Sequence, residues 1–289
     1  MKIHDTTLRA NGIEFACRVA GEGPPVLCLH GFPDTHHSFD RLLPELAAAG
    51  YQAVAPSMRG YAPSSLARDR RYGVPDLAAD VAGLIDALQV RRAAVIGHDW
   101  GAVATYAAAG LTPGRLACAV TLAVPPLRHL LFRPSLGQMW RSRYMAYFQL
   151  RGRAERRCLK NDMAFLRSLW QQWSPGWAFS EAEFAPLHEA LGSPANMNAA
   201  LRYYRALPME LFNRPARKRV LAPIRVPTLV INGEQDGCMI AATFRGLDHC
   251  FAGPWQQEEI ADAGHFLHLE QPRRFADTVV PWLQRQYRS

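Results

Sequence analysis

Val95-Ile96-Gly97-His98-Asp99-Trp100-Gly101-Ala102 is the stretch that decides the fold of this chain of 289 residues. The apolar run 93–98 is typical of a buried strand and leads directly into a helical segment of small residues, 102–109. Glycines on both sides of Asp99 permit a strained turn between strand and helix, which lifts the Asp99 side chain above the sheet. The stretch predicts a nucleophilic carboxylate; an Asp that only caps the helix is the alternative.

Strand-like and helical segments alternate on both sides of this turn, which predicts an α/β fold with a mostly parallel sheet and helices on both faces. The segment 126–219 interrupts the alternation, reads as helical and holds 14 of the 29 aromatic residues. We therefore expect a sheet core formed by 1–125 and 220–289, with 126–219 inserted as a helical cap over a ligand pocket. Strands are predicted over 14–20, 25–30, 51–55, 93–98, 116–124, 228–232 and 257–261, and body helices over 37–49, 77–88, 102–109 and 275–286.

The composition, with 49% hydrophobic and 20% charged residues, is typical of a globular protein. The net charge of +8 is concentrated between Arg128 and Arg167, where ten basic and two acidic residues fall, while the remainder of the chain is neutral. A solvated helical face is the favoured interpretation of this segment, and we expect no nucleic-acid partner. The sequence leaves a homo-oligomer open.

No apolar run reaches the roughly 18 residues of a membrane-spanning helix, and the first residues lack the apolar core of a signal peptide. We therefore expect no membrane partner. The six cysteines form no Cys-x-x-Cys pair, and several stand in apolar runs, as free thiols do in a reducing compartment. A cytoplasmic protein without metal or cofactor is expected, because neither a His-Glu-x-x-His motif nor a phosphate-binding loop is present.

Two downstream residues complete the set that a carboxylate nucleophile requires. A covalent ester on Asp99 must be hydrolysed, which needs a base to activate water and an acid to orient that base. Asp236 and His265 each follow a late predicted strand, in the order expected for the acid and the base. This placement favours them over the nearby Glu234 and His268.

An early strand ends in His30-Gly31-Phe32-Pro33, where backbone N–H groups can point into the same site. The amides of Phe32 and Trp100 are predicted to form the hole for a developing oxyanion. The sequence leaves the isomer of the Phe32–Pro33 bond open.

These motifs resemble those of the epoxide hydrolase family of α/β-hydrolases. His30-Gly31-Phe32-Pro33-Asp34 matches the family's oxyanion motif, and Gly97-His98-Asp99-Trp100-Gly101 matches its nucleophile motif. The resemblance covers nearly the whole chain and implies the α/β-hydrolase fold. It also implies that a small apolar epoxide is opened to a vicinal diol through an alkyl-enzyme ester on Asp99, which His265 and Asp236 then hydrolyse by activating water.

Two cap motifs extend the resemblance, namely 144–149 and 200–205, whose matching tyrosines are Tyr144 and Tyr204. In the family these tyrosines polarise the epoxide oxygen. Epoxide opening builds charge on that oxygen, and a phenol can donate a hydrogen bond to it while remaining neutral. The alternative is that both are amphipathic helix residues whose hydroxyls lie in water. Substrate contacts are expected from Phe32, Trp100, Tyr147 and Tyr203.

The chain departs from the family pattern at two places. Ser57-Met58-Arg59-Gly60 stands where relatives have Asp-x-Arg-Gly, and Arg151-Gly152-Arg153 replaces Pro-Gly after the first cap motif. A haloalkane or haloacetate dehalogenase with the same Asp nucleophile is the alternative function, although haloalkane dehalogenases usually have Asn at the place of Phe32. A catalytically silent binding protein with this fold is a remoter alternative.

Overall fold

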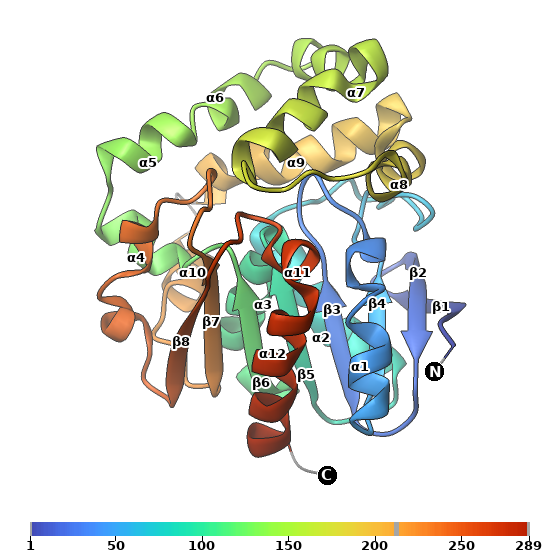
Figure 1. Cartoon of the computed structure of the whole chain (residues 1–289), viewed down its shortest axis with the longest axis vertical. Coiled ribbons are helices and arrows are strands. Elements are labelled where there is room, and N and C mark those ends of the chain that lie inside the picture. Colours follow the sequence, from blue (N-terminus) through green and yellow to red (C-terminus); the bar gives the residue numbers. More distant parts are fainter. Residues whose placement is uncertain (1, 211–213, 288–289) are drawn as a thin grey trace.

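The computed structural model describes residues 2–210 and 214–287, built around one sheet with the strand order β1-β2-β4-β3-β5-β6-β7-β8. β2 runs antiparallel to both of its neighbours, and all pairs from β4 to β8 are parallel. The mostly parallel sheet predicted from the sequence is confirmed (Figure 1). The strands are β1 (His4–Ala10), β2 (Ile13–Ala20), β3 (Pro25–Leu29), β4 (Gln52–Pro56), β5 (Ala93–His98), β6 (Leu116–Leu122), β7 (Thr228–Gly233) and β8 (Trp255–Ile260).

Helices cover both faces of the sheet. α2 and α3 pack against each other on one face, and α1 and α12 contact each other on the other face. β3, β5, β6 and β7 are buried along their whole length, which explains their continuous apolar sequences. The body helices are α1 (Leu43–Ala48), α2 (Val74–Ala87), α3 (Trp100–Leu111), α11 (Leu267–Glu270) and α12 (Pro272–Gln286), with the 3-10 turns His36–Phe39, Pro113–Arg115, Ala241–Phe244 and Leu247–Cys250.

The prediction of one continuous helix over 37–49 is wrong. The structure has a 3-10 turn at His36–Phe39, which Thr35 caps, and a separate short α1 that carries Pro44 in its first turn. Proline lacks the backbone N–H that a continuing helix would use, so a new helix can begin at Pro44 but an earlier one cannot pass through it.

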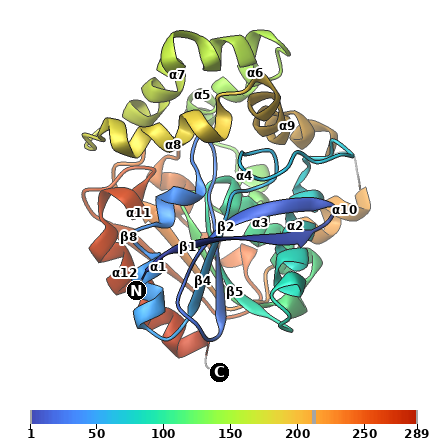
Figure 2. The ribbon, with the colours of Figure 1, turned by 90° about the vertical axis from the view of Figure 1, so that its right-hand side faces the viewer.

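The insertion between β6 and β7 forms the upper layer of the molecule. Helices α5 to α9 lie beyond the carboxyl ends of the parallel strands (Figures 1 and 2). The last helix, α10, contacts α3, so the insertion ends against the body. These helices are α4 (Leu127–Phe132), α5 (Leu136–Arg141), α6 (Tyr144–Phe148), α7 (Arg153–Trp173), α8 (Glu181–Leu191), α9 (Pro194–Glu210) and α10 (Arg214–Val220).

Within the described residues, no helix is long and apolar enough to cross a membrane. All six cysteines are free and buried.

A buried ion pair fixes the loop Ser57-Met58-Arg59-Gly60, where the sequence departs from the pattern of the family it resembles. Arg59 Nε and Nη2 donate to the two oxygens of Asp80 on α2 at 2.5 and 2.6 Å. The Ser57 hydroxyl donates to the carbonyl oxygen of Tyr61 at 3.0 Å, so a serine supports the loop at the position of the more usual aspartate. The Tyr203 hydroxyl donates to the Arg59 carbonyl oxygen at 2.7 Å, which ties the loop to α9.

Replacing one partner of this ion pair should destabilise the fold strongly. Asp80→Ala leaves the Arg59 guanidinium buried without its counter-charge, and we expect a loss of about 3–5 kcal/mol in the free energy of unfolding. Urea denaturation measures this loss. The double variant Arg59→Met/Asp80→Leu, which removes both charges, should recover most of the stability. Equal losses in the single and double variants would contradict this account.

Candidate active site

Asp99 stands at the sharp turn between β5 and α3. Its backbone has φ 51° and ψ −112°, a region that residues with side chains rarely adopt. The side chain is buried, and Oδ1 accepts a hydrogen bond of 2.8 Å from the Phe32 amide. The N-terminus of α3 favours negative charge at this point. The turn therefore places the Asp99 carboxyl group in a buried position, with Oδ2 3.6 Å from Nε2 of His265.

Glycines allow the backbone to close around this turn. A Cβ at Gly31 would stand 2.3 Å from the Asp99 Cβ, and a Cβ at Gly101 would stand 2.0 Å from the Leu29 carbonyl oxygen. Both distances lie far inside van der Waals contact. Any side chain at either position would push the carboxylate away from the Phe32 amide. The Phe32–Pro33 peptide bond is cis.

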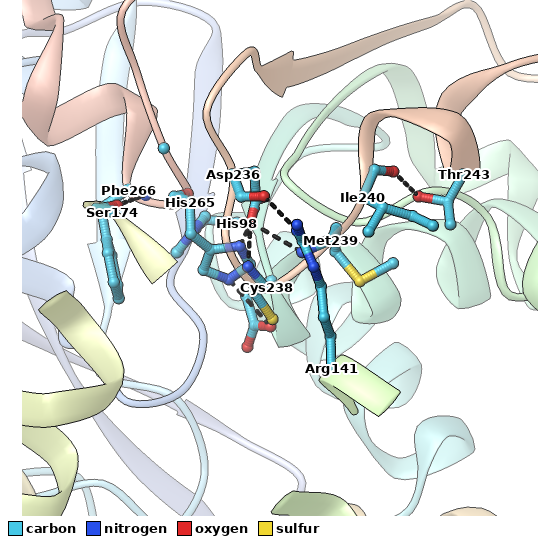
Figure 3. A network of polar contacts seen from close by, with 12 residues as sticks. His98, Arg141, Ser174, Asp236, Cys238, Met239, Ile240, Thr243, His265 and Phe266 are labelled. Carbon is cyan, nitrogen blue, oxygen red and sulfur yellow. Dashed lines mark hydrogen bonds and ion pairs between the residues drawn. The ribbon is translucent and has the colours of Figure 1, made fainter. Parts of the chain in front are cut away.

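His265 lies between two carboxylates, in the arrangement that the sequence predicts for base and acid. Its Nδ1 is 2.9 Å from Oδ2 of Asp236, and the other oxygen of Asp236 accepts from the amides of Cys238 and Met239 (Figure 3). Burial lowers the pKa of His265, but the charges of Asp236 and Asp99 outweigh this effect and raise it to about 10. The two neighbouring carboxyl groups therefore favour the imidazolium form of His265.

The C-terminus of α7 joins the loops that carry Asp236 and His265. The Trp173 carbonyl oxygen accepts from the amides of both Gly237 and His265, at 2.9 and 3.0 Å. A Cβ at Gly237 would come within 1.9 Å of the Gln172 carbonyl oxygen, so only glycine permits this approach. The sequence analysis missed this role of α7, because a backbone carbonyl carries no residue-type signal.

A second contact with the cap comes from α5 and was also missed. Arg141 donates to the Asp236 carbonyl oxygen at 2.7 Å (Figure 3). Gln138 donates to the Cys238 carbonyl oxygen and accepts from the Ile240 amide, both at 3.0 Å. Two side chains of one short helix therefore hold the loop that carries the acid.

A cavity of about 200 Å³ opens above Asp99, and its walls are mostly apolar. Trp100, Tyr144 and Tyr204 line it together with Asp99. The rings of Tyr144 and Tyr204 lie with their centroids 6.0 Å apart. The Tyr204 hydroxyl is buried without a hydrogen-bond partner among the described residues, and the Tyr144 hydroxyl lies 3.8 Å from Sγ of Cys238. Both predicted cap tyrosines therefore line the same cavity as the predicted nucleophile, Asp99.

The sequence predicts substrate contacts from Phe32, Tyr147 and Tyr203, but these three are not among the residues that line this cavity. The Tyr147 hydroxyl donates to the Arg153 carbonyl oxygen on the outer side of the cap. Tyr203 is buried, and its hydroxyl bonds to the loop of Arg59, because successive helical residues point in different directions. The Phe32 ring is fully buried against Tyr204. Phe32 therefore contacts the site through its backbone amide, which donates to Asp99.

Glu234 and His268, the alternatives to Asp236 and His265 in the sequence analysis, do not take part in this arrangement. Glu234 accepts from the Asp262 amide in an exposed loop. His268 is buried beside Asp34 and His98, and this group has the composition of a metal site. Nε2 of His98 donates to the His265 carbonyl oxygen at 3.0 Å, while its Nδ1 faces Oδ2 of Asp34 at 3.3 Å. The group therefore supports the backbone of the base.

Comparisons with known proteins agree with this geometry. The family model of the alpha/beta hydrolase fold matches residues 24–272. Epoxide hydrolase A of Mycobacterium tuberculosis strain H37Rv is 31% identical, over 94% of this chain and 95% of the relative. The epoxide hydrolase of Caballeronia sordidicola is 28% identical, over 98% and 94%. The crystal structure of epoxide hydrolase A from Mycobacterium thermoresistibile has a TM-score of 0.83 at 26% identity and covers 98% of both chains.

The strand-to-helix turn with its nucleophile position, followed along the chain by an acid and a histidine, defines the class of the protein as an α/β-hydrolase. An aspartate holds the nucleophile position, where many members of this fold have serine. The chain belongs to the epoxide hydrolase family of this fold.

The charge state of His265 makes stability depend on pH. Its folded pKa of about 10 lies above the value of about 6.5 for an unfolded chain. The imidazolium contacts therefore stabilise the fold fully below about pH 6.5 and lose this effect as the pH rises to about 10. We expect the difference in unfolding free energy between wild type and His265→Gln to shrink over this range in urea titrations. A difference that stays constant with pH would contradict the assignment.

Proposed function

We propose that this protein hydrolyses epoxides to vicinal diols in two steps, through a covalent ester on Asp99. The observation that carries the proposal is the convergence of a buried carboxylate and two tyrosines at one cavity, with a His–Asp pair beside that carboxylate. The walls favour a small apolar epoxide, since most of the side chains around Asp99 are hydrocarbon or thioether, among them Val103, Val124, Leu127, Leu130, Met145, Leu207 and Met239.

In the first step, Oδ2 of Asp99 attacks an epoxide carbon. A carbon–oxygen bond forms to Asp99, the ring carbon–oxygen bond breaks, and the electron pair goes to the epoxide oxygen. Oδ1 stays hydrogen-bonded to the Phe32 amide, so the two carboxylate oxygens have separate tasks. A carboxylate is already an anion and needs no base to activate it.

Tyr144 and Tyr204 donate hydrogen bonds to the epoxide oxygen as this charge develops. Burial raises the pKa of both hydroxyls well above the ordinary value, and the Asp99 carboxylate adds to the effect, so both remain protonated donors. A buried hydroxyl without a partner is costly, as at Tyr204, and an epoxide oxygen would supply the missing acceptor.

In the second step, His265 activates water. The resting imidazolium supplies the proton that the new alkoxide requires and becomes neutral. Esterification also removes the Asp99 charge that helped to raise the pKa of His265, which favours the neutral base. Neutral His265 takes a proton from water as the hydroxide attacks Cγ of the ester. The Phe32 amide, together with the Trp100 amide, holds the oxyanion on Oδ1. The bond between Cγ and the diol oxygen then breaks, and this oxygen takes the proton of the new hydroxyl on Cγ, which leaves the diol, the Asp99 carboxylate and the His265 imidazolium.

Diol formation from a simple aryl epoxide tests the activity, with a chloroalkane assayed in parallel. We expect diol from the epoxide and no chloride release from the chloroalkane. Chloride release without diol formation would reassign the cavity to dehalogenation.

Removing the base should trap the intermediate. In His265→Gln the ester should form and persist, because Asp99 and the two tyrosines carry out the ring opening and the alkoxide can take its proton from water when the imidazolium is absent. Intact-mass spectrometry after mixing with the epoxide should show an adduct, and peptide mapping should place it on Asp99. The account fails if this variant turns over at the wild-type rate.

Removing either phenol should slow ring opening and leave the fold intact. Tyr144→Phe and Tyr204→Phe should each cost about 2–4 kcal/mol of transition-state stabilisation, by analogy with other oxyanion donors. Pre-steady-state alkylation rates measure the cost, and the double variant should be nearly inactive. Tyr147→Phe is the matched control, since its hydroxyl lies outside the cavity. Equal effects at Tyr147 and Tyr204 would overturn the assignment.

A further inference from the structure

The cap exposes an apolar face beside the active-site cavity. Among the described residues, the four most exposed large apolar side chains lie on α4 and α5, and Leu136 reaches 84% exposure. Leu136 and Trp140 are four residues apart on α5 and so share one side of the helix. We call this set the exposed apolar face: Leu131, Phe132, Leu136, Met139 and Trp140.

Arginines stand beside two aromatic rings of the exposed apolar face. The sequence contains no Asp or Glu from residue 100 to residue 154, while six arginines fall between 128 and 153. The guanidinium of Arg128 lies 5.2 Å from the ring centroid of Phe132, and that of Arg143 lies 4.7 Å from the ring of Trp140. Arginines therefore stand beside the exposed aromatic rings, in a stretch of chain without acidic residues.

A groove of about 300 Å³ adjoins this face, between α4 and α10. Its lining is apolar apart from Arg217, and α10 also carries exposed Lys218 and Arg219. The groove and the Asp99 cavity share wall residues, so one layer of side chains separates the surface from the site: Leu127, Leu130, Met145 and Leu207.

We propose that the exposed apolar face docks onto membranes that contain anionic phospholipids. Aromatic and aliphatic side chains beside arginines match the boundary between acyl chains and acidic headgroups. Two copies of this chain joined through α4 and α5 would bring arginines together, and these two helices carry no carboxylate to oppose them, which disfavours self-association. The proposal revises the expectation that the protein has no membrane partner, and it concerns docking at the surface and not insertion.

Two residues of the exposed apolar face on α5 lie apart from the chemistry, whereas Met139 of the same face also lines the Asp99 cavity. Leu136 and Trp140 are exposed and do not line the Asp99 cavity, whereas Gln138 and Arg141 hold the Asp236 loop. Docking therefore does not depend on the reaction proposed at Asp99. Apolar molecules dissolved in the bilayer would meet the groove that borders the cavity.

Sedimentation with vesicles tests the proposal on the full chain. We expect binding to vesicles of phosphatidylglycerol and phosphatidylcholine, weaker binding to pure phosphatidylcholine, and weaker binding again as salt screens the charges. Leu136→Ser/Trp140→Ser should reduce affinity for the anionic vesicles about ten-fold or more and keep wild-type epoxide turnover in vesicle-free buffer. Arg143→Gln should reduce affinity by a smaller factor.

Two control variants match these changes elsewhere on the molecule. Leu66→Ser alters an exposed leucine next to Ser65, whose amide bonds to β2 at the far edge of the sheet. Arg273→Gln removes one positive charge from α12, in the lower part of the molecule in Figure 1. Both should bind anionic vesicles as wild type does.

Three outcomes would overturn the proposal. The first is wild-type protein that does not sediment with anionic vesicles, and the second is a Leu136→Ser/Trp140→Ser variant that binds them as wild type does. The third is a dimer in analytical ultracentrifugation that this double variant dissociates, without vesicle binding by the wild type. That result would assign the face to a second copy of the chain.

Discussion

The strained turn at Asp99 is the constraint on which the rest of the structure depends. A residue with a side chain at φ 51° and ψ −112° costs about 1–3 kcal/mol, and only the surrounding packing can hold it there. The packing comes from close backbone approaches at Gly31 and Gly101 and from the hydrogen bond of the Phe32 amide to Oδ1. The same turn sets Asp99 at the N-terminus of α3, where its charge is favoured, and directs Oδ2 toward His265.

The cap helices cover the active site and also hold two of its loops in place. The Trp173 carbonyl oxygen binds the loops of the acid and the base, while Gln138 and Arg141 hold the acid loop from the other side. Each of these contacts reaches across from the inserted helices to loops that follow β7 and β8. Changes in the cap can therefore alter the alignment of the Asp–His pair without touching either residue.

The sequence predicts the sheet and the core of the site because their signals are local. A buried strand, two glycines and a small-residue helix identify Asp99, and chain order identifies Asp236 and His265. Tyr204 also meets the cavity as the resemblance implies, but its neighbour Tyr203 faces the loop of Arg59. That distinction depends on the rotation of α9. The roles of Trp173, Gln138 and Arg141 depend on backbone atoms brought together by the fold, which no spacing in the sequence reveals.

The fate of one water oxygen tests the central claim, a covalent ester on Asp99, most directly. A single turnover in heavy-oxygen water, with enzyme in excess over epoxide, should place the label in the Asp99 carboxylate, because water attacks the ester carbonyl carbon. The first diol released should then carry an unlabelled oxygen taken from Asp99. Mass spectrometry of the peptide that contains Asp99 reads the result. Label found in the diol alone, with none in that peptide, would mean that water attacks the epoxide directly and would contradict the account.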